Sequence, residues 1–200
     1  MEYLFAVKSL IVIFIAVVSC DGQGILPNLS LSNFRNAARV FMSAPGRVPD
    51  NSDIMIVYYT TNISSPTIYR VDNLTDLLNN PDFNIGRKFE MYIPGYVELR
   101  TDESVLTVVQ SLIDAGNYSV TVMDWSNLSF GNYVTVTSNM RSAATYVCEG
   151  IQRLLQAGLP RQLFHLVGHS LGAHMASYIA ECLSDNGNKL PRITGLDPAG

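Results

Sequence analysis

The hydrophobic positions of this chain follow two periods, one typical of strands and one typical of helices. Short β-branched and aromatic runs predict strands, and apolar residues three or four apart predict helices. The predicted strands cover residues 54–60, 67–71, 88–93, 118–124, 163–167 and 192–196. Helices are predicted after Thr101, through the apolar series from Met140 to Leu155, and directly after Ser170.

Strands that alternate with helices predict an α/β fold with right-handed crossovers and a mostly parallel sheet covered by helices on both faces. The apolar run Leu163–Val167 is typical of a parallel strand that is buried on both faces. The second strand, Thr67–Val71, is expected to form a hairpin with the first. In such a sheet, reactive groups gather at the carboxyl ends of the strands.

The first 52 residues are set apart from this pattern. Lys8 precedes an apolar run, Leu10–Val18, that is too short to span a bilayer and is followed by small residues up to Cys20. Residues 1–20 are therefore predicted to be a signal peptide of a secreted, extracellular protein with no transmembrane helix. Residues 21–52, which are rich in Asn, Ser, Gly and Pro, are predicted to be an irregular N-terminal segment before a folded portion at 53–200.

Asn-x-Ser/Thr sequons agree with a secretory route. They begin at Asn28, Asn62, Asn73, Asn117 and Asn127. Four of them are predicted glycosylation sites, whereas Asn117 would be blocked if Tyr118 begins a buried strand.

The composition indicates the class of protein and argues against some binding partners. Hydrophobic residues make up 48% of the chain and charged residues 15%, which is typical of a globular protein. The net charge of −4 and the absence of a Lys/Arg run give no basis for binding nucleic acid or for a polybasic membrane patch. After signal cleavage two cysteines remain, Cys148 and Cys182, and the sequence leaves open whether they form a disulfide or stay as buried thiols.

The candidate chemistry is a G-x-S-x-G sequence between a predicted strand and a predicted helix, Gly168–Gly172. So tight a turn leaves no room for Cβ atoms two residues either side of the serine, which explains the two glycines. Ser170 would project its Oγ above the sheet as a nucleophile. The helix that begins at Leu171 would direct its N–H groups to the place where an oxyanion forms.

A catalytic acid is expected at the end of a neighbouring strand. Asp197 ends the next strand, and the 27 residues after Ser170 leave room for one crossover helix. Aspartate before proline is also a common turn opener, so spacing alone leaves both interpretations of Asp197 open. Asp124 is a rival, because it also ends a strand.

No histidine is placed to act as the general base. His165 lies inside a strand, His169 is expected to point away from Ser170, and His174 is one helical turn further and suits a packing or hydrogen-bonding role. In α/β-hydrolases the order along the chain is serine, acid, histidine, so the base would follow Asp197. The chain is therefore expected to be a truncated, incomplete catalytic domain.

The stretches Val167–His174 and Ile193–Gly200 resemble the animal pancreatic-type lipase family, especially its short insect members. Met123–Trp125 and the opening strand Ile54–Thr60 are also similar, and the likeness runs from about residue 50 to 200. The resemblance implies an α/β-hydrolase fold with its C-terminal part missing, Ser170 as nucleophile, a structural role for Asp124 and a triad histidine in an absent downstream segment.

Asp197 becomes the triad acid by the same resemblance. Members of this family cleave ester bonds of acylglycerols, or of phospholipids at the sn-1 position, as part of lipid degradation. The resemblance implies a lipid ester or lipid surface as partner, and neither a metal nor an organic cofactor.

One departure from the family concerns the oxyanion hole. The family usually has His-Gly before an aromatic residue, where this chain has Pro94-Gly95-Tyr96. The expected donors, the backbone N–H groups of Tyr96 and Leu171, are both retained, so a reshaped or weakened hole is predicted. Pro94 and the missing base also keep an alternative open, a non-catalytic lipase-like protein for lipid binding or yolk-type storage.

Overall fold

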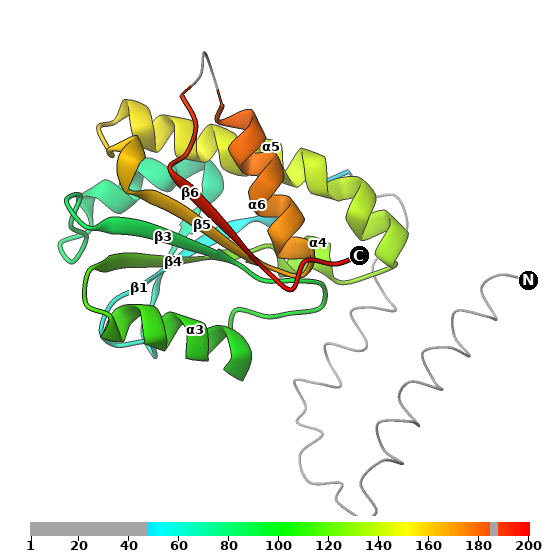
Figure 1. Ribbon diagram of the computed structural model, residues 1–200, viewed down its shortest axis with the longest axis horizontal. Helices are drawn as coiled ribbons and strands as arrows, with labels where there is room; N and C mark the ends of the chain where they lie inside the picture. The colour runs from blue at the N-terminus through cyan, green and yellow to red at the C-terminus, as the bar shows by residue number, and fades with distance from the viewer. Residues whose placement is uncertain (1–47, 185–187) are drawn as a thin grey trace, which may run out of the picture. The chain divides into compact units, whose positions relative to one another are not determined.

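The computed structural model describes residues 48–184 and 188–200, which fold around one six-stranded sheet of order β2-β1-β4-β3-β5-β6 (Figure 1). The predicted signal peptide at 1–20, most of the 21–52 segment and the sequon at Asn28 lie outside the described residues. The strands are β1 Met55–Tyr59, β2 Thr67–Arg70, β3 Lys88–Ile93, β4 Tyr118–Asp124, β5 Phe164–His169 and β6 Arg192–Leu196.

The sheet is mixed, with its parallel part where the candidate chemistry lies. β3 pairs in parallel with both β4 and β5, and β5 pairs in parallel with β6. β1 runs antiparallel to both β2 and β4. The predicted hairpin and the mostly parallel sheet are therefore confirmed, as is the expectation that the strands before Ser170 and Asp197 are neighbours.

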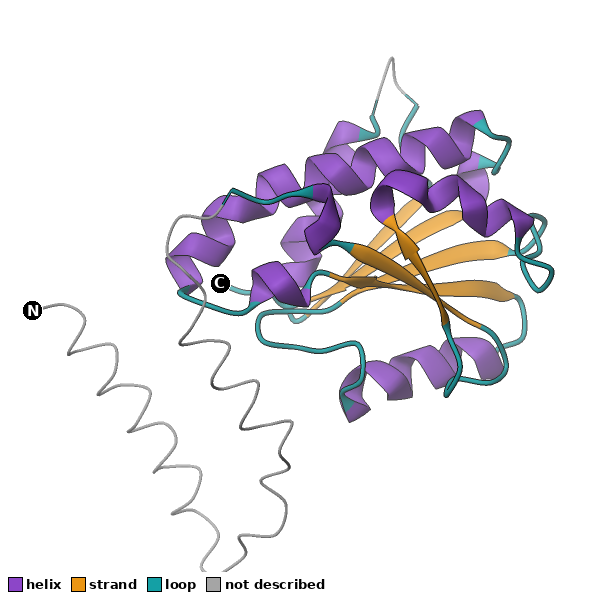
Figure 2. Cartoon of the chain, turned by 180° about the vertical axis from the view of Figure 1, so that it is seen from behind, coloured by secondary structure: helices purple, strands orange, loops and turns teal. Residues whose placement is uncertain are grey.

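Helices cover both faces of the sheet, as predicted. In Figure 2, α3 lies alone on one side of the strands, and α5 and α6 lie on the other. The helical elements are η1 Asn51–Asp53, η2 Val71–Asn79, α3 Glu103–Asp114, α4 Ser126–Ser129, α5 Tyr133–Gln156, η3 Arg161–Leu163 and α6 Leu171–Cys182. Of the helices in the described ranges, none is both long and apolar enough to cross a bilayer.

The side-chain alternation of the strands divides the core into two clusters. Val120 and Val122 of β4 point to the same face, where they pack with Val105 and Val109 of α3. Met123 points to the opposite face and joins the larger cluster formed with η2, α5 and α6. The period-2 pattern of the sequence thus places each residue correctly, because one step along a strand reverses the face.

Several element boundaries differ from the sequence prediction. β1 and β2 are slightly shorter than the predicted strands at 54–60 and 67–71. The N-cap position of α3 is Asp102 instead of Thr101; the Asp102 carboxylate makes no cap bond to the helix and accepts the Leu99 N–H of the preceding turn at 2.9 Å. α5 begins at Tyr133, two turns before Met140, because the Asn132 side chain accepts the Val134 N–H and starts the helix earlier. The predicted strand at 163–167 begins one residue later and ends at His169, since residues 161–163 form the short η3.

Cys148 and Cys182 form a disulfide, which resolves the alternative that the sequence left open. Their Cα atoms are 6.2 Å apart, and the bond joins the middle of α5 to the last residue of α6. Since α6 follows directly after Ser170, the disulfide fixes the helix that supports the candidate site.

The predicted glycosylation sites within the described residues are all exposed. Asn62 lies in a loop, Asn73 in η2 and Asn127 in α4. Asn117 is exposed as well, although Tyr118 does begin β4 and is itself half-buried. Glycosylation at these positions stays a prediction.

Candidate active site

Ser170 occupies a sharp turn between β5 and α6. It is partly exposed, and its backbone has φ 53° and ψ −120°, a conformation that L-residues rarely adopt. A Cβ on Gly168 would overlap the backbone of Gly172, and a Cβ on Gly172 would overlap the carbonyl oxygens of Ile93 and Pro94. Both glycines are therefore required by the close approach of backbone segments around the serine.

The loop after β3 packs directly against this turn. A Cβ on Gly95 would lie 2.9 Å from the Ser170 Cβ and 3.1 Å from the His169 carbonyl oxygen. The loop is held on its other side by Trp125, whose Nε1 donates to the Pro94 carbonyl oxygen at 2.9 Å. Pro94 thus uses its carbonyl group as an anchor, and its missing N–H leaves Gly95 as the first amide donor of the loop.

The residue that follows the loop aromatic is also strained. Val97 has φ 63°, and its N–H donates to the Ser129 carbonyl oxygen at 3.2 Å. A β-branched residue in the left-handed region is a genuine outlier, so the surrounding bonds must hold it there. Tyr96, between Gly95 and Val97, donates its hydroxyl to the Gly131 carbonyl oxygen and stacks edge-on against Tyr133 with the ring centroids 5.3 Å apart. Burial raises the pKa of the Tyr96 hydroxyl, and the nearby Tyr133 raises it further.

Asp197 lies next to Ser170 through the pairing of β5 with β6. The Ser170 N–H donates to the Leu196 carbonyl oxygen at 3.0 Å, and Asp197 is the following residue. Its backbone has φ 43°, and its side chain is exposed. The rival Asp124 ends β4, which is separated from β5 by β3, and is bound to Arg100 at 3.1 Å and to the Ser126 N–H. The geometry therefore brings Asp197, and not Asp124, to the serine.

Each of the three histidines is held by another partner. His165 bridges the sheet, with Nδ1 2.7 Å from the buried Glu90 carboxylate and Nε2 2.8 Å from the Thr194 hydroxyl. His174 Nε2 donates to the Ala199 carbonyl oxygen at 2.7 Å. His169 turns its Nδ1 to Glu98, 2.7 Å away. His165 lies inside β5, as expected, and the contact of His174 agrees with the packing or hydrogen-bonding role predicted for it.

Glu98 is the residue of this region that sequence reasoning missed. Its carboxylate also accepts the Gly95 N–H at 2.6 Å, so it contacts both the loop and the residue before Ser170. Burial raises the pKa of Tyr92 to about 12, and the charge of Glu98 contributes to that shift. A lone glutamate after a loop carries no sequence signal for these contacts.

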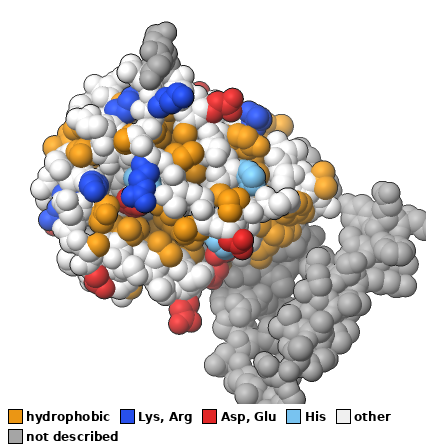
Figure 3. Space-filling model, in the orientation of Figure 1, with side chains coloured by type: hydrophobic (Ala, Val, Ile, Leu, Met, Phe, Trp, Pro, Cys, Tyr) orange, Lys and Arg blue, Asp and Glu red, His pale blue; other side chains and the backbone are white. Residues whose placement is uncertain are grey.

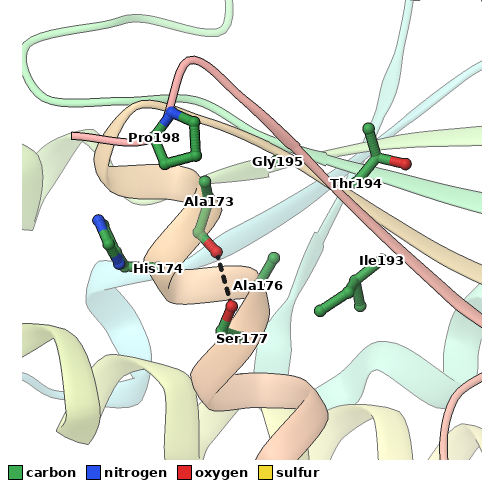
Figure 4. A pocket seen from close by; sticks show the side chains of 8 residues that line it. All are labelled: Ala173, His174, Ala176, Ser177, Ile193, Thr194, Gly195 and Pro198. Atoms are coloured by element: carbon green, nitrogen blue, oxygen red, sulfur yellow. Dashed lines mark hydrogen bonds between the residues drawn. The ribbon is translucent and has the colours of Figure 1, made fainter. Parts of the chain in front are cut away.

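A small hollow of about 180 Å³ lies beside this region, between α6 and β6 (Figure 4). Its walls come from Ala173, His174, Ala176, Ser177, Ile193, Thr194, Gly195 and Pro198. Ser170 is not among the residues that line the hollow. Ile193, which lines the hollow, and Leu196 are exposed on β6, the last strand of the sheet in the described residues. Figure 3 shows apolar side chains reaching the surface on this face of the molecule.

Within residues 48–184 and 188–200, no group of three or more His, Cys, Asp or Glu side chains is arranged to hold a metal ion.

The sheet, its helices and the strand-turn-helix around Ser170 define an α/β-hydrolase fold. A lipase family model matches residues 29–200, so the chain belongs to the lipase family. It is 28% identical over 152 residues to human phospholipase A1 member A, covering 76% of this chain and 33% of that protein. It is 29% identical over 189 residues to rat lipase member H, covering 94% and 38% of the two chains.

An insect protein is also similar. Phospholipase A1 of the hornet Vespa crabro is 32% identical over 117 residues, which is 53% of this chain and 39% of that protein. The chain therefore spans between a third and two fifths of the length of these three relatives.

Proposed function

We propose that this chain carries the nucleophile, the acid and the oxyanion hole of a secreted serine hydrolase that cleaves lipid esters. The substrate is a triacylglycerol or the sn-1 ester of a phospholipid, and residues 53–200 form the N-terminal portion of the catalytic domain. The observation that carries the proposal is the backbone of Ser170, which is held at φ 53° between β5 and α6 with its side chain partly exposed. Strain of this kind persists only where the surrounding structure maintains it, and it is concentrated at active sites.

The proposed reaction follows from the positions of the groups. Ser170 Oγ attacks the acyl carbon of the ester and forms a tetrahedral oxyanion. The backbone N–H groups of Tyr96 and Leu171 donate hydrogen bonds to the negatively charged oxygen. Leu171 is the first residue of α6, where backbone N–H groups have no partner within the helix. One donor of this kind is worth roughly 3–4 kcal/mol of barrier.

Asp197 is proposed to orient the histidine that takes the serine proton and returns it to the leaving alcohol as the ester C–O bond breaks. Water then attacks the acyl-serine and releases the fatty acid, which regenerates the Ser170 hydroxyl. His165, His169 and His174 each bind another group. We therefore assign the base to a histidine of the protein outside these 200 residues, so that the 200 residues alone are inactive. No metal or organic cofactor enters these steps.

Secretion is supported by two features of different kinds. The Cys148–Cys182 disulfide is of a kind that forms and persists in oxidising compartments and is rare in the cytosol. The signal-like sequence at 1–20 and the exposed asparagines at Asn62, Asn73 and Asn127 fit the same route.

The nucleophile is tested in the complete protein by comparing Ser170→Ala with Ser177→Ala. Ser177 lies on the same helix and donates to the Ala173 carbonyl oxygen, so it is a matched control. Hydrolysis of triacylglycerol and of sn-1-labelled phospholipid emulsions is expected to fall by more than about a thousandfold in Ser170→Ala only. Release of fatty acid that persists in Ser170→Ala would remove the assignment.

The acid is tested by comparing Asp197→Asn with Asp124→Asn. The first change is expected to lower kcat by roughly ten thousandfold, as removal of a triad acid does. The second change breaks the ion pair with Arg100. It is expected to lower the free energy of unfolding and to leave kcat close to that of wild type. A larger loss of kcat in Asp124→Asn would reverse the two roles.

A non-catalytic lipid-binding or yolk-type storage protein is the second candidate, and Pro94 beside the proposed oxyanion hole favours it. It predicts that wild-type protein binds phospholipid vesicles while showing no Ser170-dependent hydrolysis. The strained turn at Ser170 favours the enzyme, because a binding protein has no need of it.

A further inference from the structure

The loop that follows β3 adopts a conformation that it would not hold by itself. Val97 lies in the left-handed region, which costs roughly 1–3 kcal/mol for a residue of this type. Pro94 has no N–H and therefore cannot donate a bond to the turn at Ser170. The Tyr96 N–H, the proposed oxyanion donor, lies between these two residues and takes its direction from them.

The Glu98 carboxylate supplies the missing attachment. Its Oε2 accepts the Gly95 N–H at 2.6 Å and lies 2.7 Å from His169 Nδ1. Its Oε1 accepts the hydroxyl of Ser104, in the first turn of α3, at 3.3 Å. The side chain is 16% exposed, so water competes weakly for these bonds. One side chain thus joins the loop, the residue before Ser170 and the start of α3.

We propose that Glu98 is a positioning residue that fastens the loop to the turn and keeps the Tyr96 N–H directed at the substrate oxygen. The inference rests on the proposed function, since it concerns the same oxyanion hole. Gly95 and Tyr96 are adjacent, so a change at the Gly95 N–H turns the peptide groups that orient the Tyr96 N–H. A displacement of about 1 Å near a reacting centre can lower a rate about a hundredfold.

The proposed role of Glu98 depends on the length of its side chain and not on its negative charge. A carboxylate beside the hole would repel the developing oxyanion, and the Oε2 atom of Glu98 is already occupied by the Gly95 N–H and by His169 Nδ1, 2.7 Å away. Glu98→Gln keeps the length of the side chain and an oxygen that can accept from Gly95 and His169. Glu98→Asp keeps the charge but is one methylene shorter and cannot reach both partners.

The two variants therefore separate the alternatives in the complete protein. In Glu98→Gln, kcat for a soluble short-chain ester is expected to stay within about threefold of wild type. In Glu98→Asp, kcat is expected to fall at least about tenfold while KM changes less than about twofold. Glu149→Gln and Glu149→Asp are the matched controls, because Glu149 is exposed on α5, and both should leave kcat unchanged.

Hydrogen exchange of the peptide at 93–98 provides a readout that does not depend on activity. Exchange at Gly95 is expected to be faster in Glu98→Asp and unchanged in Glu98→Gln. Equal kcat in wild type and both variants, or a loss in Gln with retention in Asp, would overturn the proposal. Unchanged exchange in Glu98→Asp would also overturn it. If exchange at Gly95 is faster in Glu98→Asp but the wild-type protein shows no Ser170-dependent hydrolysis, the proposed catalytic function is refuted. The attachment of the loop by Glu98 then still holds.

Discussion

The close contact between α6 and the end of β3 can be tested by a substitution that adds one methyl group. Gly172 lies in the first turn of α6, and a Cβ there would overlap the carbonyl oxygens of Ile93 and Pro94. Both obstacles are backbone atoms, which cannot rotate away as a flexible side chain can. In Gly172→Ala the helix and the loop must therefore move apart.

The magnitude follows from the kind of overlap. Adding a methyl group to a packed interior costs typically 1–3 kcal/mol. Here the neighbours are backbone on a strand end and a loop, so we expect the upper end, about 3 kcal/mol of unfolding free energy. For a domain of 150–250 residues this corresponds to a decrease in Tm of roughly 6–12 °C. A helix shift of about 1 Å would also lower ester hydrolysis about a hundredfold.

Equilibrium urea unfolding of Gly172→Ala against Gly86→Ala measures this effect. Gly86 is exposed, and a Cβ there would approach only the side-chain oxygen of Asn84, at 3.3 Å. The Gly86 variant should lie within about 0.5 kcal/mol of wild type. If the Gly172 variant is as stable as the Gly86 variant, the close approach described for α6 and β3 is wrong.

Two further predictions concern the support of the site. Cys148→Ala/Cys182→Ala should lose roughly 3–4 kcal/mol of unfolding free energy because the bond closes a loop with a separation of 34 residues, and reduction of wild type should give the same shift in urea unfolding. A second decrease on adding reductant to the double variant would contradict this. Burial, and then the charge of Glu98, raises the pKa of Tyr92 from 10.0 to about 12, so the unfolded chain loses that proton first. The unfolding free energy should therefore fall between about pH 10 and 12, and less so in Tyr92→Phe; parallel Tm profiles for the two proteins would exclude this contribution.

The strands were predictable because their ends carry strong local signals. Lys88–Ile93 is followed by Pro94-Gly95, and Arg192–Leu196 by Asp197-Pro198, so β-branched and aromatic runs stop where proline and glycine begin. The turn at Ser170 was predictable for a similar reason. Glycines two residues before and two residues after a serine, between a strand and a helix, indicate a turn too tight for Cβ atoms at those positions.

The start of α5 was missed because the first two residues of the helix carry exposed apolar side chains, which do not fit a buried helical stripe. Tyr133 and Val134 are exposed, and the buried face of α5 begins at Val136. The contacts of Glu98 were beyond sequence reasoning for another reason. Its partners lie three residues before it and 71 residues after it, and nothing local indicates that the chain brings them together.

The distribution of backbone strain connects these observations. Among the described residues other than glycine, those with positive φ are Val97, Ser170 and Asp197. They follow β3, β5 and β6, which are neighbouring parallel strands. Three loops from different parts of the sequence are therefore strained at the carboxyl ends of these strands. Glycine at each position would relieve roughly 1–3 kcal/mol, which a sequence shaped by stability alone would gain. The strained positions instead coincide with the proposed nucleophile, the proposed acid and the loop of the proposed oxyanion hole, and this coincidence supports the proposal that the active site lies at these strand ends.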